Sequence, residues 1–348
     1  MRWPTGCRTP RSPRPGPAAS TSSCRCSRRA RRSTGELTGQ NGPVTDPTRT
    51  DVRDQPEAAL VPWTCSARSA VDEPLPGTAA QVTGWLCLEH PGAWGRDVFS
   101  GEAFGPEVST ALERRMDEAG LRLLLIRRPG RAVEAPRRRT VLLARSDPSG
   151  TWCEQLEVSE PGDLLDLDLA LPAAPSGIGR RVTDPVVLVC AHGKRDQCCA
   201  VLGRPVAADL SARFGDAVWE CSHTGGHRFA PSMIVLPTGY TYGRLTAGQS
   251  VEAVLAAGRG EVYPQGLRGR SCWTPAGQVA EVAVRQRVPA GADDLTVDES
   301  GAVPVVRHRD GRSWTVDVSS IGLEPRPASC GAVSKPVAAL VAGAVTAL

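Results

Sequence analysis

The chain has 348 residues, 41% of them hydrophobic and 22% charged, so it can bury a sizeable core and is not a disulfide-stapled mini-protein. Its formal net charge is +4, but residues 1–35 hold nine arginines and no acidic residue, which leaves a net charge of −5 on the remainder. A basic groove in the folded part is therefore not expected, and we predict no nucleic-acid partner.

The first three parts of the chain follow from composition and periodicity. Residues 1–57 are rich in Arg, Pro, Ser and Thr and poor in large apolar side chains, so they are expected to be a disordered extension. Residues 61–179 predict an N-terminal α/β domain, and residues 180–287 predict a second domain with a mixed sheet flanked by helices. The expected strands are 82–88, 121–126, 141–144, 185–190, 217–221 and 233–236. The expected helices are 106–120, 205–214, 249–258 and 275–285.

The last part, residues 288–348, is expected to form a hairpin followed by a helix. The hairpin would use strands at 303–306 and 314–318, joined by a turn that contains Asp310 and Gly311. The helix would span 335–348, with Ser334 as its N-cap.

Cysteine spacing and the lack of recognisable targeting signals predict that the protein is located in the cytoplasm. Four of the twelve cysteines, Cys190, Cys198, Cys199 and Cys221, crowd into one 32-residue window, whereas a disulfide scaffold spreads its cysteines over a short secreted chain. The N-terminal arginines are not followed by the apolar segment of a secretion signal, and no run approaches the roughly 18 apolar residues of a membrane helix. We therefore expect a cytoplasmic protein with no membrane partner.

Two cysteines and two histidines are spaced so that they can converge on one metal centre. Cys190 ends the expected strand 185–190, and Cys199 lies at the entry to the next helix. The following strand leads to His223 and His227, and the two glycines between them let the backbone fold tightly. Parallel strands joined by a helix end at the same sheet edge, so both pairs should emerge there. Because iron and zinc both accept thiolate and imidazole, these four residues are the candidate ligands.

Other interpretations of this segment fit less well. A zinc hydrolase would place Glu after the first histidine, where this chain has Thr224, and a zinc finger would separate its cysteines by two to four residues rather than eight. His192 fits no ligand spacing and is expected to be structural. Cys198 remains an alternative ligand because it is adjacent to Cys199.

The same residues carry a resemblance to a known family. Its hallmark motifs resemble two segments here, VCAHGKRDQCCAVLGRP at 189–205 and WECSHTGGHRFAPS at 219–232, and shorter likenesses occur at 77–79, 94–97 and 263–270. The chain thus resembles the sucrase/ferredoxin-like proteins, relatives of the thioredoxin-like ferredoxins, over about 65–287. This resemblance implies a thioredoxin-like ferredoxin domain. It also implies a [2Fe-2S] cluster bound through Cys190, Cys199, His223 and His227.

Electron transfer is the function that this resemblance implies, with redox donor and acceptor proteins that the sequence does not identify. Glycosidase activity is not supported, because no pair of carboxylates identifies itself as acid and nucleophile. One alternative is a structural zinc protein that uses the same four ligands. Another is a thioredoxin-like thiol-disulfide oxidoreductase using Cys198, Cys199 or Cys221, although the chain has no Cys-x-x-Cys motif.

The N-terminal α/β domain is a candidate degenerate duplicate of the second. Residues 87–97, from Cys87 to Asp97, echo residues 190–196, from Cys190 to Asp196. The first half lacks a histidine pair, so a duplicate there would hold no cluster. Two sheets of the same topology would support this interpretation.

Overall fold

The computed structural model describes residues 64–130 and 137–348, and it contains a large mixed sheet flanked by helices. The predicted extension at 1–57 lies outside the described residues. The sheet has ten strands in the order β10-β9-β8-β6-β7-β2-β1-β3-β4-β5, which confirms the mixed α/β class. Its strands are β1 (Gly84–Glu89), β2 (Leu121–Arg127), β3 (Arg139–Arg145), β4 (Trp152–Val158), β5 (Arg180–Arg181), β6 (Val186–Cys190), β7 (Val218–Cys221), β8 (Ser232–Leu236), β9 (Tyr240–Gly243) and β10 (Leu267–Arg270).

Five α-helices accompany the strands in the described part of the chain, and most were predicted closely. They are α1 (Cys65–Ser69), α2 (Pro106–Ala119), α3 (Gln197–Phe214), α4 (Ala247–Gly258) and α5 (Pro275–Arg285). Helix α3 begins eight residues before the predicted start at Pro205, because Asp196 caps it by accepting a hydrogen bond from the Cys198 backbone N–H. Cys198 and Cys199 therefore lie in the first helical turn.

The sheet is built from two units with the same topology. In one unit α2 joins the parallel strands β1 and β2, and β3 and β4 add on the other side of β1 in antiparallel fashion. In the other unit α3 joins β6 and β7, and β8 and β9 add in the same way. The units meet where β2 pairs with β7, so strands from both sides of the predicted boundary at residue 179 belong to one sheet. This shared topology supports an internal duplication.

Hydrogen bonds define which residues of the two units are equivalent. His90 N–H donates to Ile126 O, as Ala191 N–H donates to Cys221 O, so Ile126 corresponds to Cys221. These two equivalent residues pair with each other across β2 and β7, as an internal twofold axis requires. By this register Cys190 corresponds to Glu89, so the predicted equivalence of Cys87 and Cys190 was wrong.

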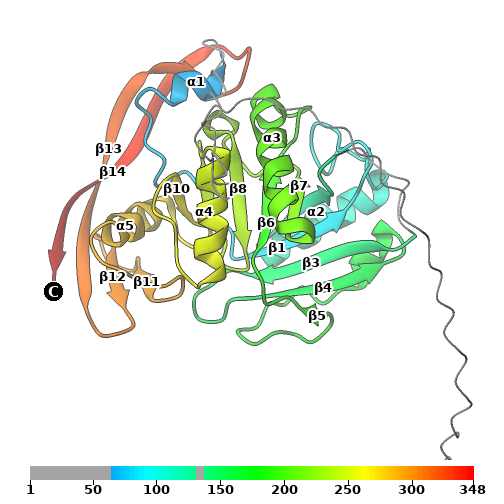
Figure 1. Cartoon of the computed structure of the whole chain (residues 1–348), viewed down its shortest axis with the longest axis horizontal. Helices are drawn as coiled ribbons and strands as arrows, with labels where there is room; N and C mark the ends of the chain where they lie inside the picture. Colours follow the sequence, from blue (N-terminus) through cyan, green and yellow to red (C-terminus); the bar gives the residue numbers. More distant parts are fainter. Residues whose placement is uncertain (1–63, 131–136) are drawn as a thin grey trace, which may run out of the picture. The chain divides into compact units, whose positions relative to one another are not determined.

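The two units share one apolar core and keep separate cores under their helices. Helix α2 covers one face of its unit, and α3 with α4 covers the equivalent face of the other (Figure 1). The opposite faces of both units contribute to a single buried cluster that includes Trp85, Ile126, Cys221 and Ile234. The sheet curls around this cluster until Ser146 Oγ, after β3, donates to Pro237 O, after β8, at 2.7 Å.

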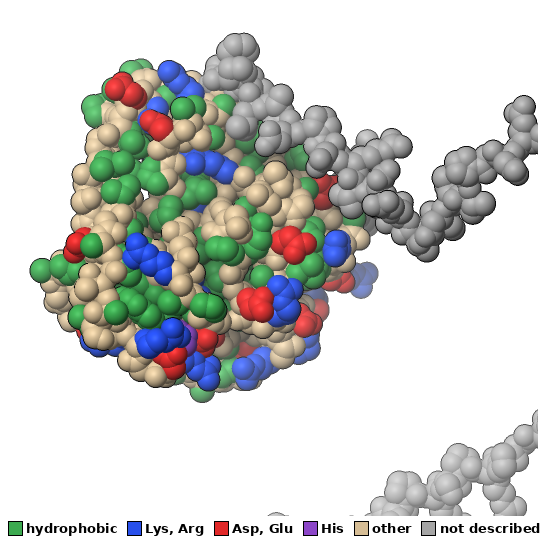
Figure 2. Space-filling model, turned by 60° about the vertical axis from the view of Figure 1, so that its left-hand side comes forward, with side chains coloured by type: hydrophobic (Ala, Val, Ile, Leu, Met, Phe, Trp, Pro, Cys, Tyr) green, Lys and Arg blue, Asp and Glu red, His purple; other side chains and the backbone are tan. Residues whose placement is uncertain are grey.

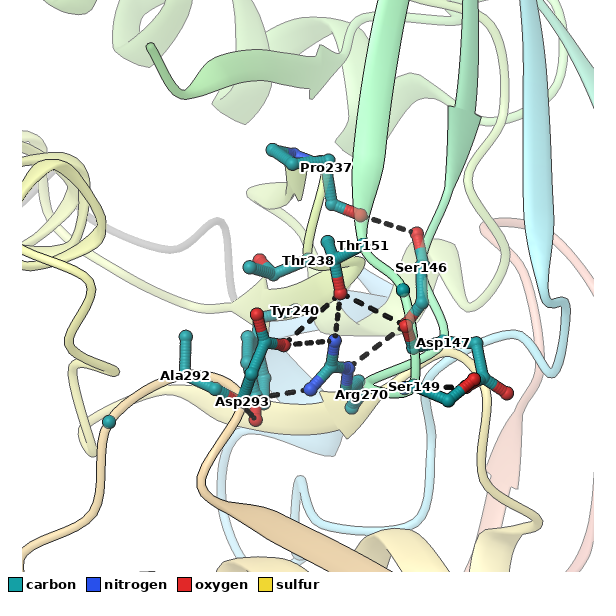
Figure 3. Close-up of polar contacts among 12 residues, drawn as sticks. Ser146, Asp147, Ser149, Thr151, Pro237, Thr238, Tyr240, Arg270, Ala292 and Asp293 are labelled. Carbon is teal, nitrogen blue, oxygen red and sulfur yellow. Dashed lines mark hydrogen bonds and ion pairs between the residues drawn. The ribbon is translucent and has the colours of Figure 1, made fainter. Parts of the chain in front are cut away.

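Arg270 at the end of β10 connects this junction to the loop before the next strand (Figure 3). Its guanidinium group is fully buried and donates to Ser146 O at 3.0 Å, Ala292 O at 2.9 Å and Thr151 Oγ1 at 2.9 Å. It also pairs with Asp293 Oδ1 at 2.7 Å. One side chain on β10 thus hydrogen-bonds two segments that are distant from it and from each other in sequence, a role that suits the rigid, multidentate guanidinium group.

A separate antiparallel sheet follows, in the order β11-β12-β13-β14. Its strands are β11 (Leu295–Asp298), β12 (Val305–His308), β13 (Ser313–Pro327) and β14 (Ser334–Ala347). The hairpin of β12 and β13 confirms the predicted hairpin, and α5 packs against both this sheet and β10. The hairpin β13–β14 extends to α1, which lies beside its turn (Figure 1).

The predicted helix at 335–348 is wrong, because this segment is strand β14. Its valines at 337, 341 and 345 recur every fourth residue, a spacing that fits one face of a helix and also one face of a strand. Pairing along almost the whole of β13 favours the strand, and Gly343 disfavours the helix.

Hydrophobic and charged side chains are mixed on the face shown in Figure 2. Green side chains are spread over it, and red and blue side chains lie at its upper, middle and lower parts. Among the helices of residues 64–130 and 137–348, none has the length and apolar character needed to cross a membrane.

Replacing Arg270 should destabilise the fold strongly. Arg270→Ala empties a buried position and leaves the carbonyl of Ser146 without this donor, so we expect the free energy of unfolding to fall by roughly 3–5 kcal/mol. Urea unfolding monitored by circular dichroism measures this change. Arg259→Ala is the control, because its ion pair with Glu261 is exposed and should change stability by about 0.5 kcal/mol or less.

Candidate metal centre

Two buried cysteines meet where β6 ends and α3 begins. Cys190 is the last residue of β6, Cys199 lies in the first turn of α3, and each is 1% exposed. The helix can approach the strand this closely because residue 203 is glycine. A Cβ atom there would lie only 2.1 Å from the Cys190 carbonyl oxygen.

His223, two residues after β7, completes a compact group with these thiols. Its Nδ1 atom lies 3.9 Å from Cys190 Sγ and 3.8 Å from Cys199 Sγ. One donor atom from each of the three residues lies within 4.8 Å of the others, as a shared metal requires. Cys198 belongs to a different group, so the geometry favours Cys199 over Cys198 as the partner of Cys190.

His227 is the fourth predicted ligand, and it lies beside this group. Its ring centroid is 5.1 Å from that of His223, and neither of its buried ring nitrogens has a hydrogen-bond partner among the described residues. Its Nε2 atom lies 3.9 Å from Asp196 Oδ2. Buried polar atoms are rarely left unpaired, so these nitrogens are suited to an additional ligand such as a metal.

The loop between the histidines depends on its glycines. Gly225 and Gly226 have φ of +95° and +68°, in the left-handed region that other residues rarely adopt. At Gly226 a Cβ atom would also lie 2.6 Å from Arg268 Nη2 and 2.7 Å from Phe229 Cδ2. This tight turn brings His227, the first residue of the 3₁₀-helix η3 (His227–Phe229), back toward His223.

Two arginines, the buried Arg268 and the half-buried Arg122, hydrogen-bond the backbone of the histidine loop. Arg122 Nη2 donates to the His223 carbonyl oxygen at 2.9 Å, and Arg268 Nη1 donates to that of Gly225 at 3.1 Å. Burial lowers the pKa of Arg122 and lowers that of Arg268 to about 9. Both groups therefore keep their positive charge near neutral pH, close to thiols that can carry negative charge.

His192 supports the site, as predicted, and is not placed as a ligand. Its Nδ1 atom accepts a hydrogen bond from the His223 backbone N–H at 3.1 Å, and its Nε2 atom lies 2.9 Å from the Gly95 carbonyl oxygen. These contacts fix a neutral ring with the proton on Nε2. His192 therefore links the first half of the chain to the histidine loop.

The paired thiols titrate as a unit. The hydrogen bond from Cys199 lowers the pKa of Cys190 well below its usual range, and the contact with His223 acts in the same direction. The same bond to Cys190, together with burial, raises the pKa of Cys199. The pair therefore holds one thiolate readily, and thiolate is the form that binds metals.

A second group of possible ligands was not recognised in the sequence. Cys65, Asp196, Cys198 and Cys330 each offer an atom within 4.8 Å of the others. They come from α1, the start of α3 and the turn between β13 and β14. Cys65 and Cys330 are more than 130 residues from Cys198, so no spacing motif could identify them.

Comparison with known proteins identifies one family. The family model described as sucrase/ferredoxin-like matches residues 75–269, which is more than half of the chain. No curated protein and no solved structure matches the chain significantly, so the thioredoxin-like assignment of residues 180–287 stays a prediction. The matched range contains the four predicted ligands and excludes Cys65 and Cys330.

The metal-free protein should lose stability on mild acidification. Burial lowers the pKa of His90, His192 and His227, so the unfolded chain binds more protons than the folded chain as the pH falls through about 6.5. We expect the free energy of unfolding of chelator-treated protein to decrease between about pH 7.5 and about pH 5.5, measured by urea titration. His227→Gln should make the decrease shallower. A free energy that stays constant or rises over this interval would contradict the prediction.

Proposed function

The chain belongs to the sucrase/ferredoxin-like family, and we propose that it is an electron carrier with a [2Fe-2S] cluster bound by Cys190, Cys199, His223 and His227. The observation that carries the proposal is the group of Cys190, Cys199 and His223, whose donor atoms lie within 4.8 Å of one another. His223 Nδ1 is within 4 Å of both thiol sulfurs, and the His227 ring lies beside that of His223. Two thiols and two imidazoles are a donor set that two-iron clusters accept.

When bound, the cluster would supply a one-electron redox couple, with a potential raised by neutral imidazole relative to an all-thiolate site. The surrounding residues fit that role. Cys190 and Cys199 lie in the core, and His192 fixes the position of the His223 backbone. The loop is thus pre-organised, which limits structural change between redox states.

Charge around the site favours the reduced state. Arg268 is fully buried and Arg122 is half-buried behind the histidine loop, and both carry a positive charge. A positive charge stabilises an added electron more strongly where water is excluded, because the effective dielectric constant is lower. The arrangement suits a carrier that accepts electrons at a moderate potential.

The histidine side is the proposed contact surface for donor and acceptor proteins. Cys190 and Cys199 are each 1% exposed, whereas His223 and His227 are only half-buried. Electrons would therefore enter and leave through the imidazole side. The nine described cysteines are all free thiols, which supports work in the reducing cytoplasm.

Metal analysis tests the cluster directly. Protein purified without oxygen should contain about two irons and two acid-labile sulfides per chain, with a visible spectrum and a paramagnetic resonance signal on reduction. His223→Ala and His227→Ala should lose most of the iron and colour. His308→Ala is the matched control, because its side chain lies on the separate antiparallel sheet.

Two results would contradict the proposal. Zinc without sulfide at these four residues would indicate the structural zinc alternative, and full iron content in both histidine variants would show that the ligands are wrong. Insulin reduction that persists in the double histidine variant would instead favour the thiol-disulfide oxidoreductase.

The arginines behind the histidine loop should influence the reduction potential. Arg122→Gln removes a positive charge behind His223, so we expect the reduction potential to fall by tens of millivolts, measured by protein-film voltammetry. Arg213→Gln, near the C-terminal end of α3, should leave it almost unchanged. A potential unaffected by Arg122→Gln would show that this charge does not tune the site.

A further inference from the structure

Three thiols from distant parts of the chain meet beside the first turn of α3. Cys65 Sγ lies 3.6 Å from Cys198 Sγ, Cys198 Sγ lies 3.2 Å from Cys330 Sγ, and Cys330 Sγ lies 3.6 Å from Cys65 Sγ. The carboxylate of Asp196 lies on the same group, 3.8 Å and 3.9 Å from Cys65 Sγ. Three sulfurs and one carboxylate therefore surround a single point.

We propose that these residues form a second metal site, a mononuclear zinc site of three thiolates and one carboxylate. Zinc prefers four tetrahedral ligands, with Zn–S bonds of about 2.3 Å and Zn–O bonds of about 2.0–2.2 Å. The sulfurs of such a tetrahedron are about 3.8 Å apart, close to the separations found here. Sulfur-rich sites of this kind are typical of structural zinc.

The surroundings of these three cysteines favour the thiolate form and hold the carboxylate ligand in place. Cys198 lies in the first turn of the long helix α3, where the positive end of the helix dipole favours negative charge. Asp196 is held in place because its oxygens accept the backbone N–H groups of Cys198 and Cys330, both at 2.8 Å. Carboxylate ligands in metal sites are commonly hydrogen-bonded in this way, because the hydrogen bonds orient the carboxylate before the metal binds.

Zinc binding at this site requires no oxidant or reductant. The thiols of Cys65, Cys198 and Cys330 release their protons to solvent, and the carboxylate of Asp196 is already ionised. Zinc keeps its +2 charge throughout, so no electron is exchanged. A disulfide would use only two of the three thiols and would need an oxidant.

The metal would fasten the outer segments to the core. Cys65 belongs to α1 and Cys330 to the turn between β13 and β14, and the two segments already meet because the Cys65 backbone N–H donates to Cys330 Sγ at 3.5 Å. Nearby, Arg326 of β13 pairs with Asp72, which follows α1, at 2.6 Å. Zinc would hold them on the end of α3 that presents Cys199 to the other site. We infer that zinc fixes this part of the histidine-cysteine pocket without taking part in electron transfer.

Metal content of the full chain tests this site. Protein supplied with zinc chloride and then desalted should keep about one zinc per chain, measured by plasma mass spectrometry beside iron. X-ray absorption at the zinc edge should show about three sulfur neighbours and one oxygen neighbour. Cys65→Ser and Cys330→Ser should each lose most of this zinc and keep their iron, whereas the control Cys272→Ser should keep both.

The histidine variant separates this inference from the proposed cluster. His223→Ala should lose iron and keep zinc, so failure at one site does not imply failure at the other. Wild-type protein that retains no zinc would overturn the inference, as would zinc that persists in both cysteine variants. Zinc bound mainly by nitrogen, or a Cys198–Cys330 disulfide found by peptide mass spectrometry after rapid alkylation, would also overturn it. The X-ray absorption measurement uses wild-type protein, so it tests the zinc ligands even if a cysteine variant fails to fold.

Discussion

The carboxylate of Asp196 is buried at the start of α3, and both groups of possible ligands are arranged around it. It caps the helix through the backbone N–H of Cys198 and binds that of Cys330, which belongs to the turn between β13 and β14. The same carboxylate lies 3.9 Å from His227 Nε2. A buried carboxylate needs such hydrogen-bond donors to offset its desolvation, so this one charge holds the start of α3 and the hairpin turn together beside the histidine loop.

Helix α3 places the adjacent residues Cys198 and Cys199 in different surroundings. Successive residues of a helix point about 100° apart, so Cys198 turns toward α1 and Cys330 while Cys199 turns toward Cys190. Both thiols lie near the positive end of the helix dipole, but the hydrogen bond to Cys190 and burial raise the pKa of Cys199, so Cys190 carries the thiolate of that pair. The close packing of the helix on β6, permitted by Gly203, keeps Cys199 within reach of the strand end.

The duplicated half supports the proposed cluster without offering a second one. The positions that correspond to Cys190, Cys199 and His223 hold Glu89, Val108 and Arg128, which cannot form a thiolate-imidazole site. That half instead provides the Gly95 carbonyl for His192 and the Arg122 guanidinium for the His223 carbonyl. Internal symmetry thus joins a unit with candidate ligands to a unit that positions them.

The sequence by itself determined the mixed α/β class, most strand positions and the family, because period-two and period-3.6 patterns and closely spaced motifs are local signals. It also identified the Cys190, Cys199 and His223 group that the fold brings together. Only the tertiary structure decided that 334–347 is a strand, because its every-fourth-residue valines fit either period and pairing with β13 selects one. The Cys65 and Cys330 contacts with Cys198 likewise exist only after folding, since they join segments more than 130 residues apart.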